Sequence, residues 1–414
     1  GFMGYNAGTI KNVTNYGNIS LPIDRNGIKF SSPQPASIAG IAFTNAGVIE
    51  NAINKGNLYG DLASDEEQRM SIAGIAVNGG KIKNSRNEGN ITFNYNKSKL
   101  NVLIGGISSG TASIDSSVNS GSIKVNIADS VAIKYILQVG GIGKGGSVKN
   151  STNEGDITII DSTSSRWSQA IFGGILVAGG TIDSCINKGN ITGFGHVGGI
   201  IGEGGNGSIQ NVRNLGKITA YSSPTYYTTE PGTHVGGIAG SSGDKNQISY
   251  AFNEGAVTVV ANENDTTTSY VGGVCGFSVW NDMNIVSNTA SISASGKKSF
   301  AGGISGFARY NKMQNIYNWG EIKSDSAAGG IIGNKYIYHN YYENVYNAAP
   351  VKAAYVGPIE PFAYEFDRTF KDTTTSIFYD SIFVRDTADK VSMFYIDPIN
   401  PRGYNSKSFT AIVA

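Results

Sequence analysis

Charged residues are scarce in this sequence. Lysine, arginine, aspartate and glutamate make up 15% of the 414 residues, well below the usual quarter, and the formal net charge is +1. A chain that binds nucleic acid or an anionic membrane through its overall field carries a clear excess of positive charge. The composition therefore argues against both kinds of partner.

Cysteine and histidine are also rare, with two and three residues respectively. Cys185 and Cys275 occupy different positions of the repeat described below, which predicts two buried free thiols and no disulfide bond. The sequence contains no H-E-x-x-H motif and no G-x-S-x-G motif. We therefore expect no metal site, no cofactor and no catalytic residues.

The sequence has no signal peptide and no apolar run long enough to span a membrane. It opens with Gly1-Phe2-Met3-Gly4, inside a repeat unit that is already under way. We expect that an exporting segment and an upstream cap were removed, so their absence excludes nothing.

Glycine, by contrast, is abundant, with 56 residues, about twice its usual share. Much of it belongs to a repeat built around the tripeptide N-x-G. A near-fixed period of 20 to 50 residues is typical of solenoids and propellers. The marker asparagines, 27 to 39 residues apart, are Asn15, Asn54, Asn87, Asn119, Asn153, Asn187, Asn214, Asn253, Asn288, Asn318 and Asn347.

Aliphatic residues recur at three positions of each unit, separated by Gly and Asn, which favours three short strands and no helix. One column lies four residues after the marker, one lies five residues before it, and one follows a Gly-Gly step. In the unit of Asn187 these residues are Ile191, Ile182 and Ile175. A single unit cannot bury such a face, whereas stacked copies bury it as a continuous ladder.

The repeat therefore predicts an all-β fold, a right-handed parallel β-solenoid (β-helix) of about eleven coils over residues 1–351, with one dry interior. At about 4.8 Å per coil the rod would be roughly 50 Å long. A propeller is the main alternative, but its blades need four strands and about 40–45 residues each.

The turn positions of the repeat differ in their chemistry. The x of N-x-G varies freely, which indicates a solvent-facing corner, and we expect the glycine after it to supply a positive φ, with Ala290 and Ala349 as exceptions. Three residues before the marker, nine units have a second Asn or a Ser. We expect these side chains to hydrogen-bond the local backbone and their counterparts in the next coil.

Differences in repeat length occur at one point, between the strand after N-x-G and the next Gly-Gly strand. In a solenoid this point forms one edge of the rod, where such proteins often bind partners, although loops also vary simply because they tolerate length. The most aromatic of these segments is Thr219–His234. Its Tyr221, Tyr226 and Tyr227 are candidate ligand-binding residues.

His196, His234, Tyr270 and Phe300 precede the Gly-Gly step in four consecutive units. Two stacked histidines would suit a metal ion, but no fixed carboxylate accompanies them. Two flat aromatic rings continue the same column, which favours a stack of rings.

The last three units change character. Gly276–Met283 aligns residue for residue with Gly306–Met313, and the next copy is rich in tyrosine. Trp280, Tyr310 and Tyr338 would then stack into an exposed aromatic strip that suits sugar rings or protein partners. Alternatively, the rings only pack the end of the rod.

The repeat stops at Lys352. The sequence then predicts two strands, over residues 376–384 and 390–396. Because an exposed solenoid end is a bare sheet edge, we expect residues 352–414 to form a capping β segment.

The string Val235-Gly236-Gly237-Ile238-Ala239-Gly240, followed by an aliphatic residue, Asn and N-x-G, resembles the GLUG-type repeat. That repeat occurs in bacterial surface proteins and in non-catalytic regions of some secreted IgA-cleaving metallopeptidases. The best matches are Val197–Ile218, Val235–Val257 and Ala301–Ile322. The resemblance implies an exported, adhesin-like, extracellular protein of the bacterial cell surface, and it carries no catalytic residues.

We therefore expect a non-enzymatic, monomeric surface protein that binds glycan or a host or matrix protein through the loop edge or the aromatic strip. A structural stalk is the first alternative, and a polysaccharide lyase or hydrolase the second. Such enzymes need paired carboxylates at a set separation. Here Glu88, Glu154 and Glu254 are scattered on variable corners that alternate with Lys55 and Lys188, which indicates solvated surface.

Overall fold

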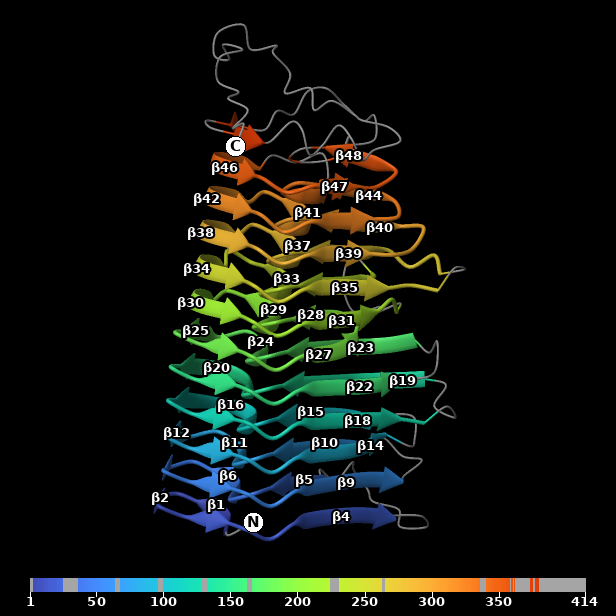
Figure 1. Cartoon of the computed structure of the whole chain (residues 1–414). Helices are drawn as coiled ribbons and strands as arrows, with labels where there is room; N and C mark the ends of the chain where they lie inside the picture. The colour runs from blue at the N-terminus through green and yellow to red at the C-terminus, as the bar shows by residue number, and fades with distance from the viewer. Residues whose placement is uncertain are drawn as a thin grey trace, which may run out of the picture.

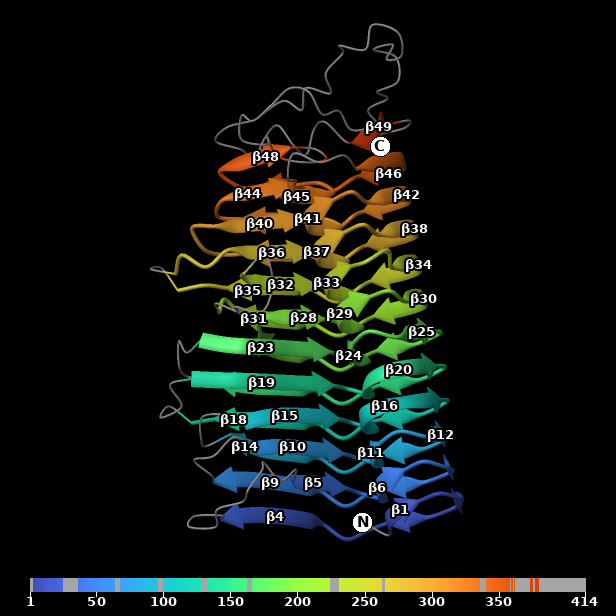
Figure 2. The same cartoon turned by 180° about the vertical axis from the view of Figure 1, so that it is seen from behind.

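The stack of coils is built from β-strands joined by turns, with no helix among the residues that the computed structural model describes. These residues are 3–24, 36–63, 68–95, 100–128, 133–161, 166–223, 231–262, 265–335, 340–357, 359, 361, 373–374 and 377–379. Neighbouring coils pair in parallel and in register, for example Ile191 with Ile218 and Ile218 with Val257. The two opposite views show a right-handed winding (Figures 1 and 2), so the predicted β-solenoid is confirmed.

One coil shows how the chain travels. The strands form three long parallel sheets, which we call A, B and C. β5 (Ala36–Ala39) lies in sheet C. β6 (Ala42–Asn45), β7 (Val48–Glu50) and β8 (Ile53–Asn54) lie in sheet A. β9 (Leu58–Ala63) lies in sheet B, opposite sheet C. The strands of sheet B end, and those of sheet C begin, at one edge of the stack (Figure 1). The connections of variable length join the two sheets at this edge, as the repeat predicted.

Sheets B and C contain eleven strands each, which agrees with the eleven predicted coils. Sheet B is formed by β4 (Ile19–Asp24), β9, β14 (Ile91–Tyr95), β18 (Ile123–Ile127), β22 (Ile157–Asp161), β27 (Ile191–Phe194), β31 (Ile218–Tyr221), β35 (Val257–Val260), β39 (Ile292–Ala294), β43 (Ile322–Ser324) and β47 (Val351–Lys352). Sheet C is formed by β5, β10 (Gln68–Ala73), β15 (Leu100–Gly105), β19 (Ile133–Gly140), β23 (Arg166–Gly173), β28 (His196–Gly198), β32 (Thr233–Gly236), β36 (Ser269–Gly272), β40 (Ser299–Gly302), β44 (Ala327–Gly329) and β48 (Tyr355–Gly357).

The interior is divided into two cores, whereas the sequence predicted one. Ile41, Ile49 and Ala52 belong to a core enclosed by sheet A. Leu58 and Ile72 belong to a second core between sheets B and C. The predicted aliphatic columns are buried as expected, except that Ile19 in the first coil is partly buried. The column after the marker lines the second core and the other two line the first.

The two cores meet at a waist, which each coil crosses at its Gly-Gly step and again at its marker asparagine. The approach is close, since a methyl group on Gly174 would lie 2.5 Å from Cγ of Asn187. Each marker side chain from Asn15 to Asn318 donates from Nδ2 to the Oδ1 of the next marker along the chain, over 2.7–2.9 Å. Each Nδ2 also donates to a carbonyl oxygen two residues on, as Asn187 does to Gly189. A continuous asparagine ladder therefore separates the cores.

The glycine of N-x-G does not adopt a positive φ, so that prediction was wrong. Glycine is favoured there because neighbouring coils approach closely, and a methyl group on Gly121 would lie 2.0 Å from the carbonyl oxygen of Gly89. Ala290 and Ala349 fit the same position because its backbone is not left-handed. The left-handed bend lies instead three residues before the marker, as at Asn150 with φ 49°.

The solenoid continues beyond residue 351. β48 pairs in parallel with β44, while β49 (Thr373–Thr374) and β50 (Ile377–Tyr379) pair in parallel with β46 (Tyr341–Asn347). Part of the predicted capping segment thus extends the repeat. The predicted strand at 390–396 lies outside the described residues, and the capping role stays a prediction.

Candidate functional site

A turn between two strands of sheet A carries a bulky aromatic side chain in two consecutive coils. In one coil it joins β37 (Cys275–Val279) to β38 (Asp282–Asn288), and in the next it joins β41 (Ser305–Arg309) to β42 (Lys312–Asn318). Trp280 and Tyr310 occupy equivalent places in these turns, with φ of 58° and 57°. The same place holds Asn206 and Lys245 in the two preceding coils, also with positive φ.

Buried asparagines hold the two turns in place. Nδ2 of Asn281 donates to the carbonyl oxygen of Ser242 over 3.0 Å, and Nδ2 of Asn311 donates to that of Ser278 over 3.0 Å. The backbone N–H of Asn281 donates to Oδ1 of Asn311 over 2.8 Å. Each turn is therefore tied to the coils beside it, and the aromatic residue before each asparagine has a fixed position.

The rings of Trp280 and Tyr310 stack, with centroids 4.1 Å apart and planes 15° apart. The indole is 50% exposed. Bulky residues with positive φ are outliers, and such strain is concentrated at functional sites. This pair, which we call the Trp280 platform, is a rigid apolar surface open to a ligand.

The predicted stacking of Trp280 and Tyr310 is confirmed, and their role in binding stays a prediction. Tyr338, Tyr226 and Tyr227 lie outside the described residues. Tyr221 is 51% exposed at the end of β31, in sheet B. It does not join the platform, because the platform lies on the sheet A turn and β31 ends at the loop edge (Figure 1).

The predicted column of rings before the Gly-Gly step forms two stacked pairs, with His234 and Tyr270 between them tilted by 51°. The ring centroids of His196 and His234 lie 4.4 Å apart, with an angle of 10° between the ring planes. Those of Tyr270 and Phe300 lie 5.5 Å apart, with an angle of 26°.

The sequence interpretation missed that Phe277 and Phe307 enter this stack from sheet A. The ring centroid of Phe277 lies 4.8 Å from that of His234, and the ring centroids of the two phenylalanines lie 4.6 Å apart. Their identical place in the two aligned segments was the available signal.

His196 has an acidic partner that the sequence interpretation did not identify. Its Nδ1 lies 2.6 Å from Oε1 of Glu203, and the imidazole is buried. Within the described part of the chain, no group of three potential ligand residues could hold a metal ion.

Both cysteines are buried and free, as predicted. Burial raises the pKa of Cys185 and of Cys275 to about 12, so neither thiol is a ready nucleophile.

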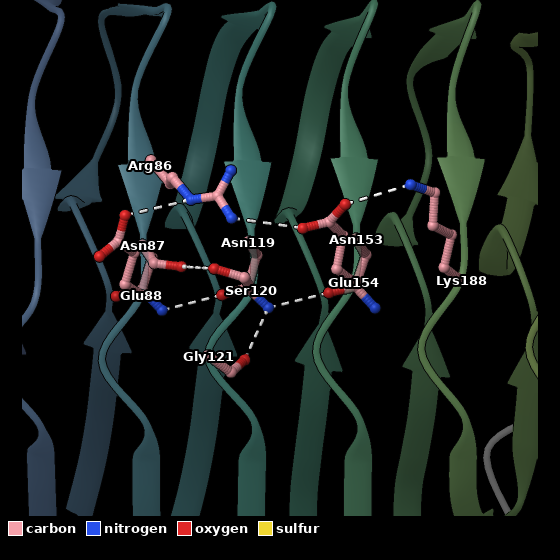
Figure 3. A network of polar contacts seen from close by, with 9 residues as sticks. All are labelled: Arg86, Asn87, Glu88, Asn119, Ser120, Gly121, Asn153, Glu154 and Lys188. Atoms are coloured by element: carbon pink, nitrogen blue, oxygen red, sulfur yellow. Dashed lines mark hydrogen bonds and ion pairs between the residues drawn. The ribbon is translucent and has the colours of Figure 1, made fainter.

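Ion pairs occupy the N-x-G corner in the first half of the solenoid (Figure 3). Arg86 contacts Glu88 at 3.2 Å and Glu154 at 3.4 Å, and Lys188 contacts Glu154 at 3.1 Å. In a later coil Arg213 contacts Glu254 at 2.7 Å. The solvated surface expected from the alternating charges is borne out, although the sequence interpretation overlooked both arginines. These carboxylates are paired with cations and not with one another.

The same corner becomes aromatic towards the C-terminal end. Trp319 is 50% exposed. The ring centroids of Trp319 and Tyr317 lie 5.5 Å apart, with an angle of 12° between the ring planes. The centroid of Tyr346 lies 6.3 Å from that of Trp319, with an angle of 69° between the planes. The sequence interpretation missed this cluster, because it took variability at the x position as a sign of chemical indifference. The signal was the tyrosine before the marker in two consecutive units.

This chain matches none of the protein-family models, curated proteins or solved structures with which it was compared. A membrane-crossing helix is absent from the portion of the chain that the structure describes.

Proposed function

We propose that this chain is a non-enzymatic, adhesin-like repeat protein of the bacterial cell surface that binds glycan or a host or matrix protein. The Trp280 platform carries the proposal. Two bulky aromatic residues in consecutive coils occupy left-handed backbone positions, at a cost of about 1–2 kcal/mol each. Folding alone favours Gly or Asn there, so the rings support a role beyond folding.

The chemistry of the platform suits these partners. An exposed indole backed by a second ring offers a flat apolar face to the C–H groups of a sugar or to an apolar anchor of a protein. The likeness to the GLUG-type repeat supports the surface location and the adhesin-like role.

A glycan and host-matrix array tests the proposal with wild type and Trp280→Asn. Asparagine suits the positive φ of residue 280, so the variant keeps the turn and loses only the ring. We expect its melting temperature to equal or exceed that of wild type, and its binding to fall about tenfold or more.

Tyr16→Ala is the matched control, because Tyr16 is an aromatic residue of the first coil and is 74% exposed. It should bind like wild type. If Trp280→Asn also binds like wild type, the platform is not the binding site.

A structural stalk is the second candidate. The asparagine ladder runs through every coil from Asn15 to Asn347, which suits a stiff spacer. Absence of any bound ligand on the array would favour this function. A polysaccharide lyase or hydrolase has less support, because Glu88, Glu154 and Glu254 form ion pairs with basic residues at exposed corners.

A further inference from the structure

A second aromatic surface lies on the other turn of the coil, where β42 leads towards β43. Tyr317 and Tyr346 are directly opposite each other on β42 and β46. Trp319 follows at the corner, with its ring nearly parallel to that of Tyr317 and at 69° to that of Tyr346. The Tyr317 ring therefore stacks against that of Trp319, and the Tyr346 ring stands edge-on to it. We call these three residues the Trp319 notch.

Two lysines lie on the sheet B strands that follow the notch along the chain. Lys323 and Lys352 are directly opposite each other on β43 and β47, and both are about half exposed. A single carboxylate serves both ammonium groups, since Oε1 of Glu321 lies 3.0 Å from Nζ of Lys323 and 3.8 Å from Nζ of Lys352. These two lysines and Glu321 together carry a net charge of +1. Lys323 lies four residues after Trp319, and Lys352 lies in the next coil.

The same surface differs in earlier coils. There the corner carries Glu88 or Glu154, and the basic partner Arg86 comes from the position just before the marker. In the last two coils tyrosine takes that position and the lysines lie on sheet B, and in one of these coils Trp319 takes the corner. An apolar platform thus replaces a row in which three basic side chains share two carboxylates.

We propose that the Trp319 notch, with Lys323 and Lys352, binds a carboxylated sugar, a hexuronate or a sialate, in an anionic glycan. The apolar face of the sugar ring stacks on the exposed ring of Trp319, which Tyr317 supports, and Tyr346 limits the position of the sugar from the side. The sugar carboxylate accepts charge-assisted hydrogen bonds from the two ammonium groups. The proposal rests on the glycan-binding function above but concerns a different turn from that of Trp280.

The test measures binding of an oligosaccharide ending in glucuronate, its sialate-ended counterpart and its neutral glucose-ended counterpart. Wild type should bind at least one acidic probe about tenfold more tightly than the neutral one, and this preference should shrink as salt is added. Trp319→Ala should weaken binding of the preferred acidic probe about tenfold. Lys323→Gln/Lys352→Gln should bind the acidic and neutral probes equally.

Two matched variants make the result specific. Lys188→Gln removes an exposed lysine that is also paired with a glutamate, several coils away, and should keep the acidic preference. Trp280→Asn alters only the other platform. No variant should melt below wild type, because the substituted side chains are exposed or half exposed.

Each outcome separates this inference from the proposed function. Loss of acidic binding in Trp319→Ala and in the double lysine variant, but not in Trp280→Asn, supports the notch. Loss only in Trp280→Asn overturns the notch and leaves the proposed function standing. Equal binding of the acidic and neutral probes by wild type, or no binding of either, overturns the inference.

Discussion

At the scale of single residues, the sharpest requirement of the coil is a left-handed backbone three residues before each marker asparagine. All eleven of these residues have φ between 47° and 57°. Asn and Ser meet this requirement in nine coils, because their short polar side chains suit left-handed positions and bond locally. Tyr250 and Ile285 are the two exceptions.

Ile285→Asn should stabilise the protein. Isoleucine is β-branched and strained at φ 57°, whereas asparagine is the residue of most other coils at this position. We expect the free energy of unfolding to rise by about 1 kcal/mol, measured as a shift of the urea midpoint. Val286→Asn, one residue on and fully buried, should lower it. A lower midpoint for Ile285→Asn would contradict the strain argument.

Two aspartates in sheet A predict loss of stability in acid. Hydrogen bonds from Asn150 and Asn211 lower the pKa of Asp115 and Asp183 respectively. Because the folded-state pKa is the lower one, the stabilisation is complete above the unfolded-state pKa of about 4. It is lost as pH falls through the folded-state value.

Asp115→Asn/Asp183→Asn keeps the acceptor oxygens and removes both titrations. We expect its melting temperature to fall less than that of wild type between pH 7 and pH 3. Asp282→Asn, at an exposed position of β38, serves as the control for the change of charge. Identical pH profiles for wild type and the double variant would refute the linkage.

At the scale of elements, the Gly-Gly step decides where the strands of sheet C turn into sheet A. Its second glycine is present in every described coil that has the step, from Gly40 to Gly330. The glycine is needed for space, because the asparagine ladder and the next coil both lie against it.

Gly174→Ala should therefore be strongly destabilising. The new methyl group would lie 2.1 Å from the carbonyl oxygen of Gly199 and 2.5 Å from Cγ of Asn187. We expect a loss of about 3 kcal/mol in the free energy of unfolding, from denaturant melts. Gly8→Ala is the control, since nothing lies within 4 Å of a methyl group there. Equal stability of the two variants would show that the backbone at the waist can move to make room for the methyl group.

At the scale of the whole molecule, stability comes from contacts between neighbouring coils, so position along the stack matters. The side chain of Asn187 is fully buried. It accepts a hydrogen bond from Asn153 and donates hydrogen bonds to Asn214 and to the carbonyl oxygen of Gly189. Asn15, in the first coil, is only partly buried and makes its ladder bond on one side.

Asn187→Ala should cost about 3 kcal/mol, because it leaves buried polar groups on both sides without partners. Asn15→Ala should cost about 1 kcal/mol or less. Hydrogen exchange should show faster exchange in the coils on either side of Asn187→Ala, and only in the first coils for Asn15→Ala. Equal losses at the two positions would mean that the ladder does not bind the coils together.

The sequence by itself determined the fold class, the number of coils, the aliphatic columns and the stacking of Trp280 on Tyr310. The physical reason is periodicity. When copies of one unit stack in register, residues at equal places in the repeat come together, so the contacts between coils follow directly from the alignment.

Contacts within a coil required the tertiary structure, because they join different places of the repeat. The division into two cores, the asparagine ladder against the Gly-Gly step and the entry of Phe277 into the histidine stack are all of this kind. So is the Trp319 notch, whose rings and lysines come from two strands of each of two coils. The path of the chain around the coil brings them together, and no spacing in the sequence records that path.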